Sequence, residues 1–200
     1  MANRRPKILA FAGSLRKDSV NKKLIQVAQK GAKDAGADVT LIDLKDFPLP
    51  IYDGDIEDKN GQPAEAVRLK KLMMEHDGFL IASPEYNSSI SAVLKNAFDW
   101  VSRPVPNEEY LIAFKNKVAG LLTASPSYMG GIRGLVHLRS ILGNVGTLVL
   151  PDQFTIANAY EAFDENGNLK DTKKRDHALK IAADLANIIA KLQAEQLAVR

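Results

Sequence analysis

The chain of 200 residues contains no cysteine, which excludes disulfide bonds, thiolate catalysis and cysteine-ligated metal sites. It also contains no apolar run near the length of about 20 residues that a membrane-spanning helix needs. Residues 1–7 are too few and too polar to be read as a signal peptide. We therefore expect a cytoplasmic protein without a membrane partner.

Several short motifs are absent as well. The sequence has no GxGxxG dinucleotide fingerprint and no GxxxxGK[ST] phosphate loop. It also has no GxSxG nucleophile elbow, so a hydrolase has little support. His76, His137 and His177 lack the spacing of metal ligands. The acidic residues in the polar loop expected at 53–58 lack the EF-hand pattern, and we expect no metal site.

The charges of the chain are nearly balanced. Lys and Arg number 27 against 24 Asp and Glu, which gives a formal net charge of +3. No Lys/Arg-rich run with interleaved aromatic residues occurs, so a nucleic-acid partner is not expected. A mildly basic chain is compatible with anionic small molecules.

What the sequence does contain is a regular alternation of two hydrophobic patterns. Short apolar runs predict buried strands, and stripes of period 3.6 predict helices between them. The strands are expected at 7–12, 38–44, 78–82, 117–123 and 146–150, and the helices at 20–35, 63–76, 90–101, 132–143 and 171–195. Residues 151–170 are expected to be irregular. Trp100 fits either the core or an interface.

Strands that alternate with helices indicate an α/β fold whose parallel sheet is covered on both faces. Right-handed crossovers leave two common open sheets, a six-stranded Rossmann type and a five-stranded flavodoxin-like type. Five strands favour the second, a three-layer sandwich with strand order 2-1-3-4-5. Without a linker or an internal repeat, residues 1–200 are expected to form one domain.

In such sheets ligands bind beyond the carboxyl ends of the strands, where the strand order reverses. The loop after the first strand, residues 13–21, offers the hydroxyls of Ser14 and Ser19, the Asn21 amide and the Arg16 guanidinium, next to a helix N-terminus. This set suits an anion, and best a monophosphate. The alternative is plain capping of the helix by Ser19 or Asp18, with Arg16 in solvent.

The loops after the third and fourth strands have equally unusual sequences. In residues 83–88, Pro84 turns the chain out of the sheet, and Tyr86 presents a flat face on which a ring could stack. Alternatively this loop is a surface turn in which Ser88 or Ser89 caps the next helix. In residues 124–131 a pair of glycines permits close backbone approach to a ligand, or simply makes a flexible connector.

Taken together, three segments resemble the NADPH-dependent FMN reductases, and within them the quinone and chromate reductase branch. These segments are GSLRxxSxN after the first strand, PEYN followed by SAVLKNAFDWVSR, and a GG loop followed by GIRGLVHLR. The resemblance covers about residues 7–150, and PEYN with LKNAxDW is its most specific part. The sequence departs from the usual pattern at 127–129.

The resemblance implies cofactor-binding roles for eleven residues. Four would hold the FMN phosphate: Ser14, Arg16, Ser19 and Asn21. Four would line the isoalloxazine ring and ribityl chain: Pro84, Glu85, Tyr86 and Asn87. Three would approach the other edge of the flavin: Ser125, Gly130 and Gly131.

The resemblance also implies an activity, an FMN-dependent reductase with NADPH or NADH as a transient hydride donor. The cofactor would carry the redox chemistry, so no catalytic acid–base residue is expected. Hydride would pass from the nicotinamide C4 to the flavin N5. One open flavin face would then serve donor and acceptor in turn, a ping-pong mechanism. Quinones, chromate, ferric chelates, azo compounds and free flavin are candidate acceptors, and a homodimer or homotetramer is implied.

Two other functions are compatible with the same fold. A flavodoxin-type electron carrier would bind FMN but deliver electrons to a protein partner, and such carriers tend to be acidic, unlike this chain. A regulatory or scaffold protein would bind no flavin at all. Fold alone does not separate these alternatives, because function depends on the loops.

Overall fold

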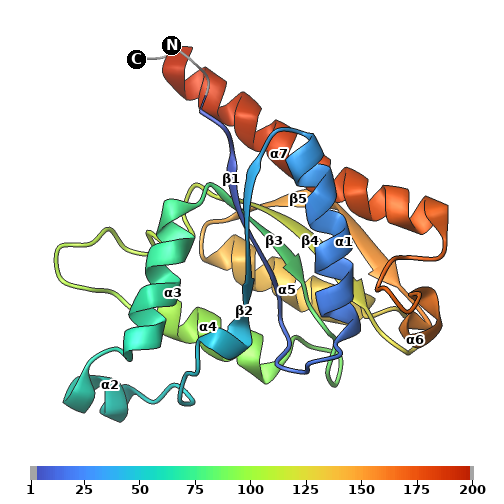
Figure 1. The fold of residues 1–200 in the computed structure, drawn as a ribbon. Helices are drawn as coiled ribbons and strands as arrows, with labels where there is room; N and C mark the ends of the chain where they lie inside the picture. Colours follow the sequence, from blue (N-terminus) through green and yellow to red (C-terminus); the bar gives the residue numbers. More distant parts are fainter. Residues whose placement is uncertain (1–3, 199–200) are drawn as a thin grey trace.

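The computed structural model describes residues 4–198 and contains a five-stranded, wholly parallel sheet between two layers of helices (Figure 1). The strands are β1 (Lys7–Ala12), β2 (Asp38–Asp43), β3 (Gly78–Ala82), β4 (Val118–Ala124) and β5 (Leu148–Ile156). Their order is β2-β1-β3-β4-β5. The predicted flavodoxin-like topology is therefore confirmed.

The helices divide between the two faces of the sheet. They are α1 (Val20–Asp34), α2 (Gly54–Asn60), α3 (Ala64–Glu75), α4 (Ala92–Val101), α5 (Ile132–Asn144), α6 (Ala159–Ala162) and α7 (Thr172–Ala198), with a 3-10 turn η1 (Leu44–Asp46) after β2. One face is covered by α1 and α7, and the other by α3, α4 and α5 (Figure 1).

The two cores follow from the alternation of side chains along each strand. In β1, Ile8 and Ala10 enter the core under α1 and α7, whereas Leu9 and Phe11 enter the opposite core. Every residue of the central strands β3 and β4 is buried, which is why these strands appear in the sequence as continuous apolar runs. The edge strand β2 is largely exposed.

The expected end of the fifth strand at Leu150 is wrong. The strand β5 continues through Pro151 to Ile156. A proline is tolerated here because β5 is an edge strand and its register against β4 shifts between Ala119 and Leu121, as at a β-bulge. This extension carries the chain six residues further along the sheet, toward the edge where ligands bind.

Two short helices also lie where irregular structure was expected. The helix α2 occupies the acidic segment at 53–58; the Asp53 side chain caps it by accepting from the Asp55 N–H at 2.9 Å. No residue of α2 is buried, so the sequence carries no apolar stripe that could reveal it. The helix α6 lies within the segment 151–170.

The structure shows which residues cap two of the helices and where Trp100 lies. Ser19 does cap α1, but α4 is capped by Ser91 rather than by Ser88 or Ser89. Trp100 is wholly buried, and its Nε1 donates a hydrogen bond to the Pro50 carbonyl at 2.8 Å. It therefore belongs to the core of the chain and ties the segment after β2 to α4.

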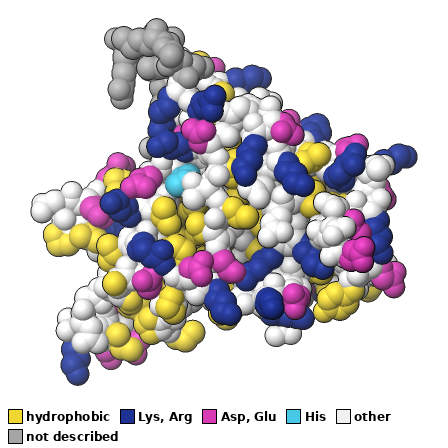
Figure 2. Space-filling view, viewed as in Figure 1, with side chains coloured by type: hydrophobic (Ala, Val, Ile, Leu, Met, Phe, Trp, Pro, Cys, Tyr) yellow, Lys and Arg dark blue, Asp and Glu magenta, His cyan; other side chains and the backbone are white. Residues whose placement is uncertain are grey.

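Charged side chains of both signs are spread over the surface (Figure 2). Figure 2 shows Lys and Arg interspersed with Asp and Glu on the face in view, rather than gathered into a field of one sign. None of the described helices combines the length and apolar character needed to cross a bilayer. Within residues 4–198, no three His, Asp or Glu side chains gather as a metal site would require.

The close packing of α1 against α7 gives a test of the fold. A Cβ at Gly31 would lie 2.0 Å from the Leu179 carbonyl oxygen, so Gly31→Ala should destabilise the protein by about 1–3 kcal/mol through overpacking. Gly143→Ala in α5 is the matched control. Nothing lies within 4 Å of its added Cβ, so better helix propensity should stabilise by up to about 1 kcal/mol. Urea unfolding measures both, and equal shifts for the two variants would contradict this packing.

Candidate functional site

A polar cavity of about 260 Å³ opens at the carboxyl edge of the sheet, between the loops after β1, β3 and β4. Eight of the eleven residues predicted to bind the cofactor line it: Ser14, Arg16, Ser19, Asn21, Pro84, Glu85, Tyr86 and Ser125. Asn87, Gly130 and Gly131 are not among its lining residues. The structure thus brings the three unusual loops together at the predicted place.

The first loop presents an anion-binding surface. The helix α1 begins at this cavity, and no acidic residue lies in its first turn, so its partial positive charge is not offset from within the helix. Ser19 caps the helix by accepting from the Asn21 N–H at 3.2 Å, and the Ser14 hydroxyl accepts from the Arg16 N–H at 3.3 Å. Both serines are buried. Hydroxyls and helix N–H groups of this kind suit a phosphate.

Arg16 is exposed at the mouth of this cavity, near two tyrosines. A side-chain hydrogen bond with Tyr160 raises the pKa of the guanidinium above its ordinary value, and the nearby Tyr86 and Asp18 act in the same direction. The group is therefore a permanent cation beside the helix N-terminus. The Asp18 carboxylate also lines the cavity and partly opposes the binding of an anion.

Asn21 connects two of the loops around the cavity. Its side chain is only 1% exposed, and both of its polar atoms are engaged. Nδ2 donates to the Ala124 carbonyl at 2.8 Å, while Oδ1 accepts from the Ala124 N–H at 2.9 Å. The amide therefore fastens the first turn of α1 to the end of β4.

The PEYN segment forms a tight hairpin. Tyr86 and Ser89 exchange two backbone hydrogen bonds of 2.9 and 3.0 Å, while Asn87 and Ser88 between them have positive φ angles of 49° and 66°. Two central residues with positive φ are typical of a type I′ turn. Asn87 lies at the tip, and the Tyr86 side chain is 51% exposed at the cavity. The hairpin thus holds an aromatic face at the site.

Glu85 clamps this hairpin to the start of α5. Its Oε1 accepts from the Arg133 Nε at 2.9 Å and its Oε2 from the Gly134 N–H at 3.1 Å. The Glu85 side chain is 6% exposed, and a Cβ on Gly134 would lie 3.2 Å from the Glu85 Cβ. A second link joins the Ser89 hydroxyl to His137 Nδ1 at 2.9 Å. Glu85 is thus occupied in holding two loops together.

The paired glycines serve the backbone of the third loop. Gly131 precedes α5 with a φ of 93°, and a Cβ there would lie 2.2 Å from the Thr123 hydroxyl oxygen. Gly130 has a φ of 64° and lies close to the Ala157 N–H. Glycine is required at 131 by both conformation and space. These backbone requirements account for the two glycines, neither of which lines the cavity.

Sequence reasoning missed five lining residues: Asp18, Val20, Ala124, Pro126 and Tyr160. Four of them lie within or beside the predicted loops. Tyr160 comes from α6, beyond the end of β5. Residues that follow the carboxyl end of a strand are expected near the ligand site, and Tyr160 is such a residue. The strand was expected to end at Leu150, so Tyr160 was not placed there.

These residues fit the phosphate end of FMN. The lining combines buried serine hydroxyls, a helix N-terminus and a guanidinium, which are the groups that bind a phosphate ester. A volume of about 260 Å³ is below the range of roughly 300–1,000 Å³ typical of pockets that enclose a whole ligand. The cavity can therefore accept the phosphate and adjoining chain, while an aromatic ring would lie at the surface near Tyr86.

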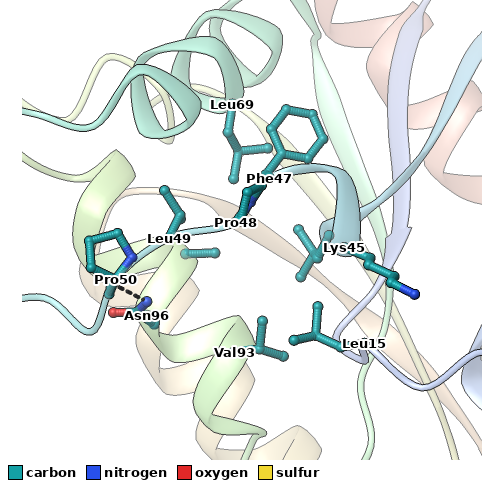
Figure 3. A pocket seen from close by; sticks show the side chains of 11 residues that line it. Leu15, Lys45, Phe47, Pro48, Leu49, Pro50, Leu69, Val93 and Asn96 are labelled. Carbon is teal, nitrogen blue, oxygen red and sulfur yellow. Dashed lines mark hydrogen bonds between the residues drawn. The ribbon is translucent and has the colours of Figure 1, made fainter.

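A second, larger cavity lies beside the first. This apolar groove of about 520 Å³ runs between the segment 44–50, α3 and α4 (Figure 3). Leu15 and Val93 face each other at one end, and Asn96 donates to the Pro50 carbonyl at 2.8 Å at the other. Leu15 lies between Ser14 and Arg16, so one loop forms a wall of both cavities. Hydrophobic side chains also gather over this side of the molecule in Figure 2.

The flavodoxin-like topology and a phosphate-type cavity at its strand-order switch are the features expected of a flavin-nucleotide-binding protein. The sequence profile of the NADPH-dependent FMN reductases matches residues 6–161. The chain belongs to the NADPH-dependent FMN reductase family. It is an oxidoreductase that uses FMN, with NAD(P)H as electron donor.

Individual proteins with similar sequences or structures are named as reductases of the same kind. The chain is 36% identical over 183 residues to an NAD(P)H:quinone oxidoreductase of Solanum tuberosum, covering 88% of this chain and 90% of the relative. It is 38% identical over 172 residues to an NAD(P)H-dependent FMN reductase of Pseudomonas aeruginosa, covering 85% and 88%. Among solved structures, the flavoenzyme NAD(P)H:(acceptor) oxidoreductase FerB of Paracoccus denitrificans superimposes with a TM-score of 0.75 at 29% identity, covering 93% of this chain and 98% of that one.

The Glu85 clamp predicts a stability effect. In Glu85→Gln one acceptor oxygen becomes an amide donor, so Arg133 or Gly134 loses its partner, and we expect a loss of about 1–3 kcal/mol. Glu65→Gln is the matched control, because Glu65 pairs with Arg68 on the exposed surface of α3 and should contribute less than about 1 kcal/mol. Chemical denaturation of both variants measures the difference. A Glu85→Gln variant as stable as the control variant would contradict the clamp.

Proposed function

We propose that this chain reduces quinones, taking its electrons from NAD(P)H by way of an FMN bound in the polar cavity. The observation that carries the proposal is the juxtaposition of a phosphate-type cavity at the start of α1 with the half-exposed Tyr86 ring at its mouth. Residues 1–200 would act as a single FMN-binding domain.

The residues have separate roles in this proposal. Ser14, Ser19 and Arg16 would hold the phosphate, together with the N–H groups of the first turn of α1. Tyr86 and Pro84 would support the ring, and Ser125 would lie at its other side. Bound FMN supplies the two-electron chemistry, so the task of the chain is to bind and orient it. None of the cavity's side chains is assigned as a catalytic acid or base.

Donor and acceptor would use the same place in turn. The polar cavity is too small to enclose a ring, so a flavin ring held at Tyr86 would have one face toward the protein and the other toward solvent. A single exposed face accommodates either a nicotinamide or a quinone, but not both at once. The proposed kinetic mechanism is therefore ping-pong.

Quinones are the proposed acceptors because several relatives are named for them. Besides the Solanum tuberosum protein, an Escherichia coli quinone reductase is 34% identical over 143 residues. An open ring face sets few steric limits, so chromate, ferric chelates, azo compounds and free flavin remain secondary acceptors in this proposal. A membrane or nucleic-acid partner is not part of it.

The proposed assembly is a homodimer or homotetramer, in the cytoplasm. The apolar groove beside α4 supports self-association, because exposed apolar surface of this kind is often covered by a partner (Figure 3). The resemblance to the FMN reductases likewise implies an interface near this helix. The absence of cysteine is consistent with a reducing compartment.

The phosphate role predicts a selective loss in Arg16→Ala. Charge-assisted hydrogen bonds to phosphate are among the stronger ones, so FMN affinity should fall at least about 10-fold while the fold is retained. Lys17→Ala is the control, since Lys17 is also exposed but does not line the cavity. Fluorescence titration of apoprotein with FMN measures both, and equal affinities for the two variants would show that Arg16 is only a surface charge.

The shared ring face predicts the steady-state pattern. With NADPH and a benzoquinone varied together, double-reciprocal plots should be parallel, because the oxidised nicotinamide must leave before the quinone enters. Product inhibition by NADP⁺ should be competitive with the quinone, because both would bind the reduced form of the protein. Intersecting lines would mean that both substrates bind at once, and the shared-face proposal would then be wrong.

A further inference from the structure

The apolar groove of Figure 3 is large enough to hold a small organic ligand. Its volume of about 520 Å³ lies within the range of roughly 300–1,000 Å³ that is typical of small-molecule sites. Among the residues that line it, only Lys45 and Asn96 have polar side chains. A groove with this lining selects a ligand, or a part of a ligand, that needs no hydrogen bonds.

The polar groups of the lining are occupied or turned away. Asn96 Nδ2 donates to the Pro50 carbonyl at 2.8 Å, and its Oδ1 accepts from the Tyr52 N–H at 2.8 Å. The Lys45 ammonium points away from the cavity (Figure 3). Pro48 and Pro50 have no N–H to donate. The ribose and phosphate groups of a nicotinamide nucleotide would lose hydrogen bonds here, so the groove favours a hydrocarbon chain.

Contacts within the protein hold the groove open. The Pro50 carbonyl also accepts from Trp100 Nε1 at 2.8 Å, so two donors of α4 fix this end of the wall. At the other end, the Arg68 guanidinium of α3 lies over the Phe47 ring, 3.9 Å from its centre. A ligand would therefore enter a formed groove and would not have to order its walls.

The groove adjoins the proposed flavin site. Leu15 lines the groove, whereas its neighbours Ser14 and Arg16 line the polar cavity. The Leu15 side chain is 48% exposed, so it presents apolar surface between the two cavities. The Ser91 hydroxyl donates to the Gly13 carbonyl at 2.6 Å and fixes this loop against the start of α4. A ligand with a ring at the flavin and a chain over Leu15 could occupy both places.

We propose that the groove is the subsite for a hydrocarbon side chain of the quinone, so that the preferred acceptors are quinones with an alkyl or prenyl chain. This inference rests on the proposed quinone reductase function and narrows its substrate class. The quinone ring would lie on the exposed flavin face. Its chain would pass into the groove between Leu15 and Val93, which face each other at this end (Figure 3).

A second copy of the chain is the rival occupant, because the same groove supports the proposed self-association. An assembly that fits this inference must leave the end between Leu15 and Val93 open. A partner that filled this end would exclude the side chain of the quinone. The length of that side chain would then have no effect on the rate.

The test uses benzoquinones that carry a methyl, butyl or octyl group. The FMN-loaded full chain is assayed with NADPH, and kcat/KM is measured for each quinone. The variants are Val93→Trp, which fills the groove beside Leu15, and Val93→Thr, which keeps the size of the side chain but adds a hydroxyl. Val67→Trp is the control, since Val67 lies on α3, is 51% exposed and does not line the groove. The readout is the octyl-to-methyl ratio within each variant, so a general change in activity cancels.

We expect the ratio to report burial of part of the chain. Burying one methylene group gains about 4-fold in affinity, so burying two or three raises kcat/KM about 10- to 100-fold. The wild type and Val67→Trp should both show this rise. In Val93→Trp it should fall below about 3-fold, because the indole takes the place of the chain. In Val93→Thr it should fall about 2- to 5-fold, because the hydroxyl lacks a partner against hydrocarbon.

Three outcomes would overturn the inference while the proposed function stands. They are equal kcat/KM for the methyl and octyl quinones in the wild type, a ratio that Val93→Trp retains as fully as Val67→Trp, and dissociation of the assembly by Val93→Trp in sedimentation velocity, which would make the groove an interface between copies. If the wild type reduces none of these quinones, the proposed function itself fails.

Discussion

Two hydrogen bonds between the Asn21 amide and the backbone of Ala124 join the first turn of α1 to the end of β4. They are buried, so they are strong and costly to leave unmade. Through them the loop that offers an anion site and the loop that follows β4 keep a fixed separation. The cavity lies between these two loops.

Similar contacts set the other walls of the site. Glu85 connects the Tyr86 hairpin with α5, and Ser125 connects the third loop with the segment after β5. In each case a polar group in a loop is satisfied by a neighbouring segment of the protein rather than by solvent. These loops are therefore held in place by contacts within the protein. A ligand that bound between them would require little ordering of the protein.

The fold could be predicted because parallel strands buried on both faces appear as short apolar runs, such as residues 78–82. The edge strand β5 was harder, since Pro151 and exposed polar residues obscure its second half. The topology rule predicted where the three loops would meet, but not the hydrogen bonds that their side chains make. Glu85 and Arg133 are 48 residues apart, so no local pattern reveals that this carboxylate is already occupied.

The central claim is that the chain exchanges electrons between NAD(P)H and a small acceptor through bound FMN. The most direct measurement is anaerobic rapid mixing of the FMN-loaded protein with NADPH, followed by a benzoquinone, with the flavin identified by mass spectrometry after heat release. The account predicts FMN as the released flavin, loss of its visible absorbance on mixing with NADPH, and rapid return on mixing with the quinone. Release of FAD, or absorbance that neither NADPH nor NADH diminishes, would contradict it.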